Sequence, residues 1–126
     1  MSKILIVDDA EDICFLLTRL LQLGGYSTDT AADGVDALEH IQKSQPDLIL
    51  LDMMMPRMNG IEMLSILRHD PRYRDLPVMV YTTLSDATLL QSIERLGVQD
   101  LIVKGSIDGS TLLDRIAERL SPELLN

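Results

Sequence analysis

The chain has 126 residues, 46% of them hydrophobic, which is enough for one folded domain with its own core and excludes a disordered tail. Its 20 acidic residues outnumber its 11 Lys and Arg residues, so the formal charge is −9 at pH 7. A field of that sign repels phosphate backbones and anionic lipids, and we therefore expect no direct contact with nucleic acid or with a membrane.

The first half of the chain alternates between short apolar runs, which predict strands, and apolar side chains at helical spacing. The predicted elements are a strand at 4–7, a helix with its stripe from Ile13 to Leu21 that Gly24 and Gly25 end, an edge strand at 26–31, a helix with its stripe from Val35 to Ile41, and a strand at 48–51. The runs at 4–7 and 48–51 are apolar without interruption, as expected of parallel strands covered on both faces.

The second half repeats this alternation. Its predicted elements are a helix with its stripe from Ile61 to Leu67, a strand at 78–81, a helix with its stripe from Leu89 to Leu96, a strand at 101–103, and a helix from Leu113 to Leu120 that ends near Pro122. This order predicts an α/β fold with a doubly wound, five-stranded parallel sheet, five helices on its two faces, and a single domain over residues 1–126. Ligands of such folds bind beyond the carboxyl ends of the strands.

Residues suited to phosphate or metal chemistry follow four of the five predicted strands. Asp8 and Asp9 follow the first strand, Asp52 the third, Thr82 the fourth and Lys104 the fifth. If the three carboxylates converge, their mutual repulsion favours a hard divalent cation such as Mg²⁺. Lys104 and Thr82 are suited to hold a phosphoryl oxygen, and Asp52 is suited to accept the phosphoryl group as a nucleophile.

Each of these residues also has an ordinary structural explanation. Asp8 or Asp9 can cap the first helix. Thr82 can be a strand residue and Lys104 a solvated lysine, neither with a further role. Asp52 is harder to explain in this way, because an acid that ends an apolar strand costs free energy unless it is paired. The joint occurrence of all five at strand ends favours one common site.

The cellular compartment is indicated by cysteine usage and by the apolar runs. Cys14 is the only cysteine, so no internal disulfide forms, which favours a reducing cytoplasm. The apolar run before Asp8 is too short for a secretion signal, and Asp52 interrupts the longer apolar stretch at 48–58. We therefore expect a cytoplasmic protein without a membrane span.

Four signals occur along the chain in a recognisable order. They are the run from Ile4 to Asp9, the highly specific segment from Leu51 to Gly60, Thr82, and finally Gly97 with the pair Val103 and Lys104. In these residues the chain resembles the receiver domain of two-component response regulators, over essentially its whole length.

The resemblance implies a flavodoxin-like sheet with strand order 2-1-3-4-5 and a role for each residue at the strand ends. Asp52 would accept a phosphoryl group from a histidine kinase or a phosphotransfer protein. The ligands of Mg²⁺ would be Asp8, Asp9, Asp52 and the backbone carbonyl of Met54. Thr82 and Lys104 would contact the phosphoryl group.

The resemblance also implies a signalling switch rather than a turnover enzyme. Phosphorylation would repack the fourth helix, the fifth strand and the fifth helix into a surface that binds a downstream protein. Apolar residues of that surface are Leu89, Leu90, Leu101 and Ile107. Because only a short tail follows Leu120, the resemblance is to a stand-alone, single-domain regulator.

Three positions depart from the family pattern. Leu101 stands where an aromatic switch residue is usual. Gly105 follows Lys104 in place of a proline, so we expect a trans peptide bond and an altered loop. Thr83 replaces a small residue, and it either narrows the approach to Asp52 or adds a second hydroxyl.

Met54 and Leu84 occupy two positions that tune hydrolysis of the phosphoryl group in this family. Both are apolar here, and neither can orient an attacking water by hydrogen bonding. We therefore expect slow autodephosphorylation and a long-lived aspartyl phosphate.

Two alternatives of different class remain open. Leu101 and Gly105 are also compatible with a receiver-like module that binds its partner constitutively, without control by phosphorylation. A metal-dependent phosphohydrolase would be a true enzyme. Such enzymes often place a second acid two residues after the nucleophile, where this chain has Met54.

Overall fold

The computed structural model describes residues 1–83 and 86–120. Within them strands and helices alternate along the chain, as the apolar pattern predicts. The strands are β1 (Lys3–Val7), β2 (Ser27–Ala31), β3 (Leu48–Leu51), β4 (Val78–Thr82) and β5 (Asp100–Val103). The helices are α1 (Glu11–Leu23), α2 (Gly34–Lys43), α3 (Gly60–His69), α4 (Ala87–Arg95) and α5 (Gly109–Leu120).

The strands form one sheet in the order β2-β1-β3-β4-β5, and every neighbouring pair is parallel. This confirms the predicted doubly wound fold and its strand order 2-1-3-4-5. The predicted strand limits agree with the observed ones to within one residue. The edge strand β2 begins at Ser27 instead of Tyr26, because the N–H of Tyr26 donates to the carbonyl oxygen of Leu21 in α1, whereas that of Ser27 donates to Ser2 beside β1.

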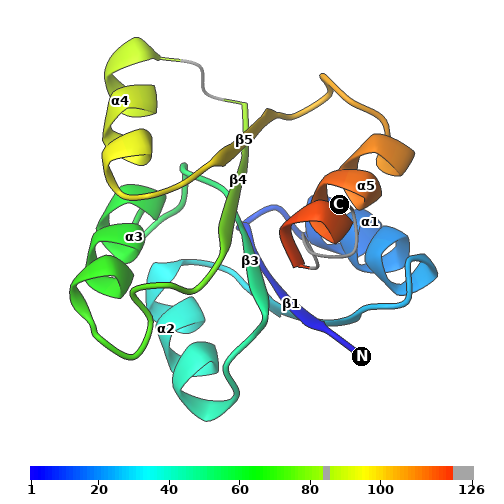
Figure 1. Cartoon of the computed structure of the whole chain (residues 1–126), viewed down its shortest axis with the longest axis horizontal. Coiled ribbons are helices and arrows are strands. Elements are labelled where there is room, and N and C mark those ends of the chain that lie inside the picture. The colour runs from blue at the N-terminus through cyan, green and yellow to red at the C-terminus, as the bar shows by residue number, and fades with distance from the viewer. Residues whose placement is uncertain (84–85, 121–126) are drawn as a thin grey trace.

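Alternate residues of the central strands enter two separate cores, one on each face of the sheet. Leu5, Val7 and Leu51 face α2, α3 and α4, whereas Ile6 and Leu50 face α1 and α5. Figure 1 shows this division, with α2, α3 and α4 on one side of the strands and α1 and α5 on the other. Since both faces are covered, β1 and β3 have no polar face, which accounts for their uninterrupted apolar sequence.

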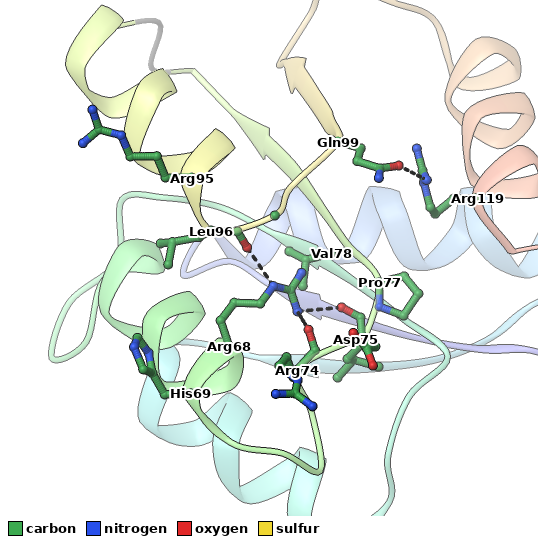
Figure 2. Close-up of a pocket in the computed structure, with 12 residues that line it drawn as sticks. Arg68, His69, Arg74, Asp75, Pro77, Val78, Arg95, Leu96, Gln99 and Arg119 are labelled. Atoms are coloured by element: carbon green, nitrogen blue, oxygen red, sulfur yellow. Dashed lines mark hydrogen bonds between the residues drawn. The ribbon is translucent and has the colours of Figure 1, made fainter.

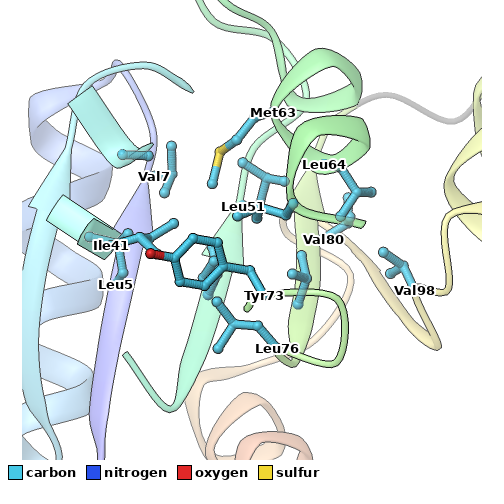
Figure 3. Packing of buried hydrophobic residues seen from close by; sticks show 14 of the residues in the cluster. Leu5, Val7, Ile41, Leu51, Met63, Leu64, Tyr73, Leu76, Val80 and Val98 are labelled. Carbon is cyan, nitrogen blue, oxygen red and sulfur yellow. The ribbon is translucent and has the colours of Figure 1, made fainter. Parts of the chain in front are cut away.

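The connection from α3 to β4 is part of the folded domain. Arg68, at the end of α3, donates from Nη1 to the carbonyl oxygens of Arg74 at 3.1 Å and Leu76 at 2.9 Å (Figure 2). Tyr73 and Leu76 point back into the core beside Leu5 and Ile41 (Figure 3). The loop therefore closes the end of the core on this face of the sheet.

Four helices begin at side chains that accept backbone hydrogen bonds, and α5 is one of them, because the N–H of Thr111 donates to Oδ1 of Asp108 at 2.8 Å. Asp33 and Asp86 accept N–H groups at the starts of α2 and α4, and Asn59 forms a reciprocal capping box with Glu62 at the start of α3. No helix in the described residues combines the length and the apolarity that a membrane crossing requires. The predicted helix end near Pro122 lies outside the described residues.

Candidate functional site

The register of the sheet places the polar residues that follow the strands along one edge. Val7 pairs with Leu51 in the neighbouring strand, and the N–H of Asp52 donates to the carbonyl oxygen of Val7 at 2.9 Å. At the other side of β4, the N–H of Lys104 donates to the carbonyl oxygen of Thr82 at 2.8 Å. The strand ends thus bring together the residues that the sequence analysis selected.

The three acids converge as predicted. One carboxylate oxygen from each of Asp8, Asp9 and Asp52 lies within 4.8 Å of the other two. Asp8 is 4% exposed and Asp52 is 7% exposed, whereas Asp9 is open to solvent. Two of the three like charges therefore lie where water screens them poorly, which requires compensation by a cation.

Lys104 supplies part of that compensation. Its Nζ donates to Oδ2 of Asp8 at 2.7 Å and lies 3.4 Å from Oδ2 of Asp52. Burial alone would lower the pKa of Lys104, but the hydrogen bond to Asp8 and the charge of Asp52 outweigh it and raise the pKa. The ammonium also lies 5.8 Å from the centroid of the Tyr81 ring, within the range of a cation–π contact.

The charge and chemistry of this cluster fit a divalent cation. The single ammonium of Lys104 leaves two negative charges unbalanced among the carboxylates of Asp8, Asp9 and Asp52. Carboxylate oxygens are hard ligands, and each has lone pairs beyond the one that a hydrogen bond uses. The arrangement can therefore hold a divalent metal ion together with an anionic group above Asp52.

The idea that Asp8 or Asp9 merely caps the first helix is wrong. The residue at the N-cap of α1 is Ala10, and no side chain caps it. Oδ1 of Asp8 instead accepts the N–H of Ala10 at 2.9 Å, which forms a local turn before the helix. This bond fixes the carboxylate that also pairs with Lys104.

The structure describes all three positions that depart from the family pattern. The Lys104–Gly105 peptide is trans, as predicted, and Gly105 has a φ of 83°, in the left-handed region that glycine adopts without steric cost. Leu101 is partly buried against the core on the α3 and α4 face, and Thr83 is exposed. Leu84 lies outside the described residues.

The side chain of Met54, in the loop after Asp52, is exposed and apolar. The backbone carbonyl of this residue is a predicted metal ligand. Met54 is 59% exposed, whereas its neighbour Met53 is buried. Thr82, at the end of β4, is fully buried. Met54 has no polar side-chain group other than its thioether.

One contact of this loop escaped the sequence analysis. Arg57 has a φ of 60°, an unusual conformation for a residue with a Cβ, and its Nε donates to Oδ2 of Asp33 at 2.6 Å. This hydrogen bond lowers the pKa of Asp33 and ties the loop after Asp52 to the start of α2. The only available signal was the helix-capping pattern at Asp33, which does not indicate a partner 24 residues away.

The family model of the response regulator receiver domain matches residues 4–119. The chain belongs to the response regulator receiver domain family. This agrees with the resemblance drawn from the strand-end motifs.

Individual members of the family are similar over nearly the whole chain. Chemotaxis protein CheY4 of Vibrio cholerae has 34% identity and a TM-score of 0.87, with 95% of this chain and 99% of that chain covered. The Regulator of RpoS of Escherichia coli (strain K12) is 36% identical over 125 residues, which cover 99% of this chain. Protein RcaC of Microchaete diplosiphon is 34% identical over 119 residues, or 94% of this chain.

The curated relatives are much longer than this receiver domain. The matched region spans 36% of the Regulator of RpoS and 18% of Protein RcaC. The likeness therefore concerns the receiver domain and does not extend to the remainder of those proteins.

The left-handed conformation of Arg57 yields a prediction about stability. We expect Arg57→Gly to melt at a higher temperature than Arg57→Ala, by roughly 2–6 °C, because both lose the contact with Asp33 but only glycine relieves the positive φ. Circular dichroism melting of the two variants measures the difference. Arg72 is a matched control, since it is exposed and lacks a positive φ, so glycine there is expected to melt below alanine. An Arg57→Ala variant as stable as Arg57→Gly contradicts the prediction.

Proposed function

We propose that this receiver domain accepts a phosphoryl group on Asp52 from a phosphohistidine of a histidine kinase or a phosphotransfer protein. A carboxylate oxygen of Asp52 would attack the phosphorus, the new P–O bond would form as the P–N bond breaks, and the imidazole would leave with the electron pair and take up a proton. The observation that carries this proposal is the position of Asp52, which is nearly buried between two other carboxylates and the Lys104 ammonium.

Magnesium is the cation that we propose for the acidic cluster. Asp8, Asp9, Asp52 and the backbone carbonyl of Met54 would be its protein ligands, and Mg²⁺ commonly retains open positions for phosphoryl oxygens. When bound, the ion would offset the charge that develops on the transferring group. In support, three carboxylate oxygens already lie close enough to share one ion.

Lys104 and Thr82 would then bind the phosphoryl oxygens. The ammonium of Lys104 contacts Asp8 and Asp52, and a dianionic phosphoryl group on Asp52 would attract it more strongly than a carboxylate does. Thr82 is buried at the end of β4, where a movement of its hydroxyl toward the phosphoryl group would be felt by the neighbouring strand β5. Such a shift would bias the packing of α4, β5 and α5.

The consequence would be altered binding of a downstream protein at the surface of α4, β5 and α5, and not a catalytic cycle. Within that surface Leu89 and Leu101 are partly buried against one core and Ile107 against the other, so each can change its exposure if the elements repack. We place this relay in the cytoplasm, where kinases draw phosphoryl groups from ATP. The domain would therefore act as a phosphoacceptor switch and not as a turnover enzyme.

Constitutive binding is the second candidate function, and Leu101 favours it. A leucine packed against the core has no polar tip with which to follow the hydroxyl of Thr82, so the usual aromatic coupling is absent at this position. In this case the domain would have the same fold and the same binding surface, and phosphorylation would not change that surface.

Labelling tests the acceptor assignment. We expect the wild-type chain, with Mg²⁺ and a labelled small-molecule phosphodonor, to gain one phosphoryl group that hydroxylamine removes, and Asp52→Asn to gain none because it lacks the nucleophilic oxygen. Asp12→Asn removes an exposed acid of α1 outside the cluster and is expected to label normally.

Persistent labelling of Asp52→Asn would show that another residue is the acceptor. A separate measurement addresses the constitutive alternative. If beryllofluoride with Mg²⁺ binds at Asp52 but leaves the amide resonances of α4 and β5 unchanged, the surface is not controlled by phosphorylation.

The acidic cluster predicts opposite effects of one substitution with and without metal. Asp9→Asn is expected to stabilise the metal-free chain slightly, because it removes one of three neighbouring like charges. The same variant is expected to bind Mg²⁺ at least about tenfold more weakly, because a charged ligand is lost.

Thermal melting over a Mg²⁺ titration measures both effects, since a ligand that binds the native state raises the melting temperature. Asp12→Asn is again the matched control and should retain the response of the wild type. Equal Mg²⁺ responses in Asp9→Asn and wild type would exclude Asp9 as a ligand.

The lifetime of the phosphoryl group depends, in this proposal, on the apolar side chain at position 54. Met54→Asn is expected to shorten the half-life of the labelled domain severalfold, because an exposed amide beside Asp52 can orient a water for attack. Met54→Leu keeps the side chain apolar and is expected to leave the half-life unchanged. Loss of label is followed over time after the phosphodonor is removed, and equal half-lives in the three chains would refute the role of Met54.

A further inference from the structure

Tyr81, which directly precedes Thr82 in β4, brings an aromatic ring to the lysine of the acidic cluster. The Nζ of Lys104 lies over this ring, 5.8 Å from its centroid, and the same ammonium donates to Oδ2 of Asp8 at 2.7 Å. An aromatic face attracts a cation within about 6 Å of its centroid, and the attraction is stronger where water is excluded. Lys104 therefore has two kinds of partner, carboxylates and an uncharged ring.

Tyr81 and Lys104 lie on the same face of the sheet. The Tyr81 side chain packs against the core cluster beside α1 and α5 (Figure 1), and so does Ile102, its partner in β5. Val80 packs against the opposite core. Because side chains alternate between the two faces of a strand, Lys104, two residues after Ile102, continues on the side of Tyr81. The register of the strands thus sets the ring beside the lysine.

Core packing alone does not account for an aromatic residue at position 81. The other four residues of β4 are buried, whereas Tyr81 is partly buried and borders a cavity of about 170 Å³ that Leu16, Ile107 and Leu112 also line. Tyr81 therefore fills the core incompletely, while its ring face reaches the ammonium of Lys104.

The backbone after Lys104 restrains the lysine weakly. Gly105 has a φ of 83° and no Cβ, whereas a proline at this position would fix φ at about −65°. A lysine side chain has many rotamers, and ordering it costs conformational entropy. Contacts at the far end of the side chain therefore decide where the ammonium lies.

The ring differs from the carboxylates in its response to a metal ion. A divalent ion at Asp8, Asp9 and Asp52 would compete with Lys104 for the carboxylate oxygens. An aromatic ring is no ligand for a hard cation, so its attraction for the ammonium would persist. The ring is thus a partner that can keep Lys104 close to Asp52 when the carboxylates are occupied.

We propose that Tyr81 is a positioning residue for phosphoryl transfer and that its ring holds the Lys104 ammonium where it meets a phosphoryl oxygen on Asp52. This inference rests on the proposed function of Asp52 as the acceptor. A cation that is already in place when charge develops on the transferring group stabilises that charge without reorganisation. Loss of the ring would leave the lysine to sample other rotamers, and transfer would become slower.

The position of the lysine is tested first, without metal and without phosphodonor. In a chain with ¹³C-labelled lysine, the ring current of Tyr81 is expected to shift the side-chain methylene resonances of Lys104 upfield. This shift should persist in Tyr81→Phe, which keeps the ring, and disappear in Tyr81→Leu. Lys3 and Lys43 are internal references and should not move. An unchanged Lys104 spectrum in Tyr81→Leu would overturn the proposal.

The rate of labelling is tested second, with Mg²⁺ and a labelled small-molecule phosphodonor. Tyr81→Leu is expected to label at least about threefold more slowly than the wild type, and Tyr81→Phe should restore most of the rate. Tyr26→Leu is the matched control and should leave the rate unchanged, because Tyr26 is partly buried against the same core cluster but lies before the start of β2, at the other end of the sheet.

An equal loss of rate in Tyr26→Leu would show a general effect of core packing, and a Tyr81→Phe variant as slow as Tyr81→Leu would show that the hydroxyl acts instead of the ring; either result overturns the proposal. Melting temperatures show whether each variant is folded, and Tyr81→Met replaces Tyr81→Leu if the latter is not. Absence of label in the wild type would contradict the acceptor role of Asp52, whereas absence of the Lys104 shift would contradict the role of Tyr81. The two failures are therefore distinguishable.

Discussion

Carboxylates at adjacent strand ends repel one another, and the rest of the site must compensate for this repulsion. Asp8 and Asp52 follow two paired strands whose apolar residues are buried, so their charges are held together in a place that water reaches poorly. Within the described residues the direct compensation comes from Lys104, which lies 96 residues from Asp8 in the sequence. Only a complete sheet brings these groups together, and the charge that remains accounts for affinity toward a divalent ion.

The end of the sheet opposite to the acidic cluster carries several arginines. Acids gather at the carboxyl ends of the strands, while arginines gather where β4 and β5 begin and where α3 and α4 end. Helix dipoles favour cations at the ends of helices, and the central strands keep the two groups apart. Arg68 connects the basic end to the fold, because it binds the carbonyl of Leu96, the residue that caps α4.

The fold and the convergence of the acidic residues were predicted from local features that are present in the native structure. Runs such as 4–7 and 48–51 are apolar throughout because helices cover both faces of the sheet, and this pattern is visible without any knowledge of contacts. Asp52 and Lys104 were predicted as site residues because parallel strands end at one edge. Asp33 and Arg57 were missed, since a hydrogen bond between two loops follows from the path of the chain and leaves no periodic signal.

By itself, the sequence determined the alternation of strands and helices, the buried character of β1 and β3, and the residue types available at each strand end, because these depend on local periodicity and composition. The tertiary structure alone decided which charges meet. It paired Lys104 with Asp8 instead of leaving it in water, and it gathered Arg68, Arg74 and Arg95 around one cavity. Coulombic attraction and desolvation depend on distance and burial in space, and separation along the chain sets neither.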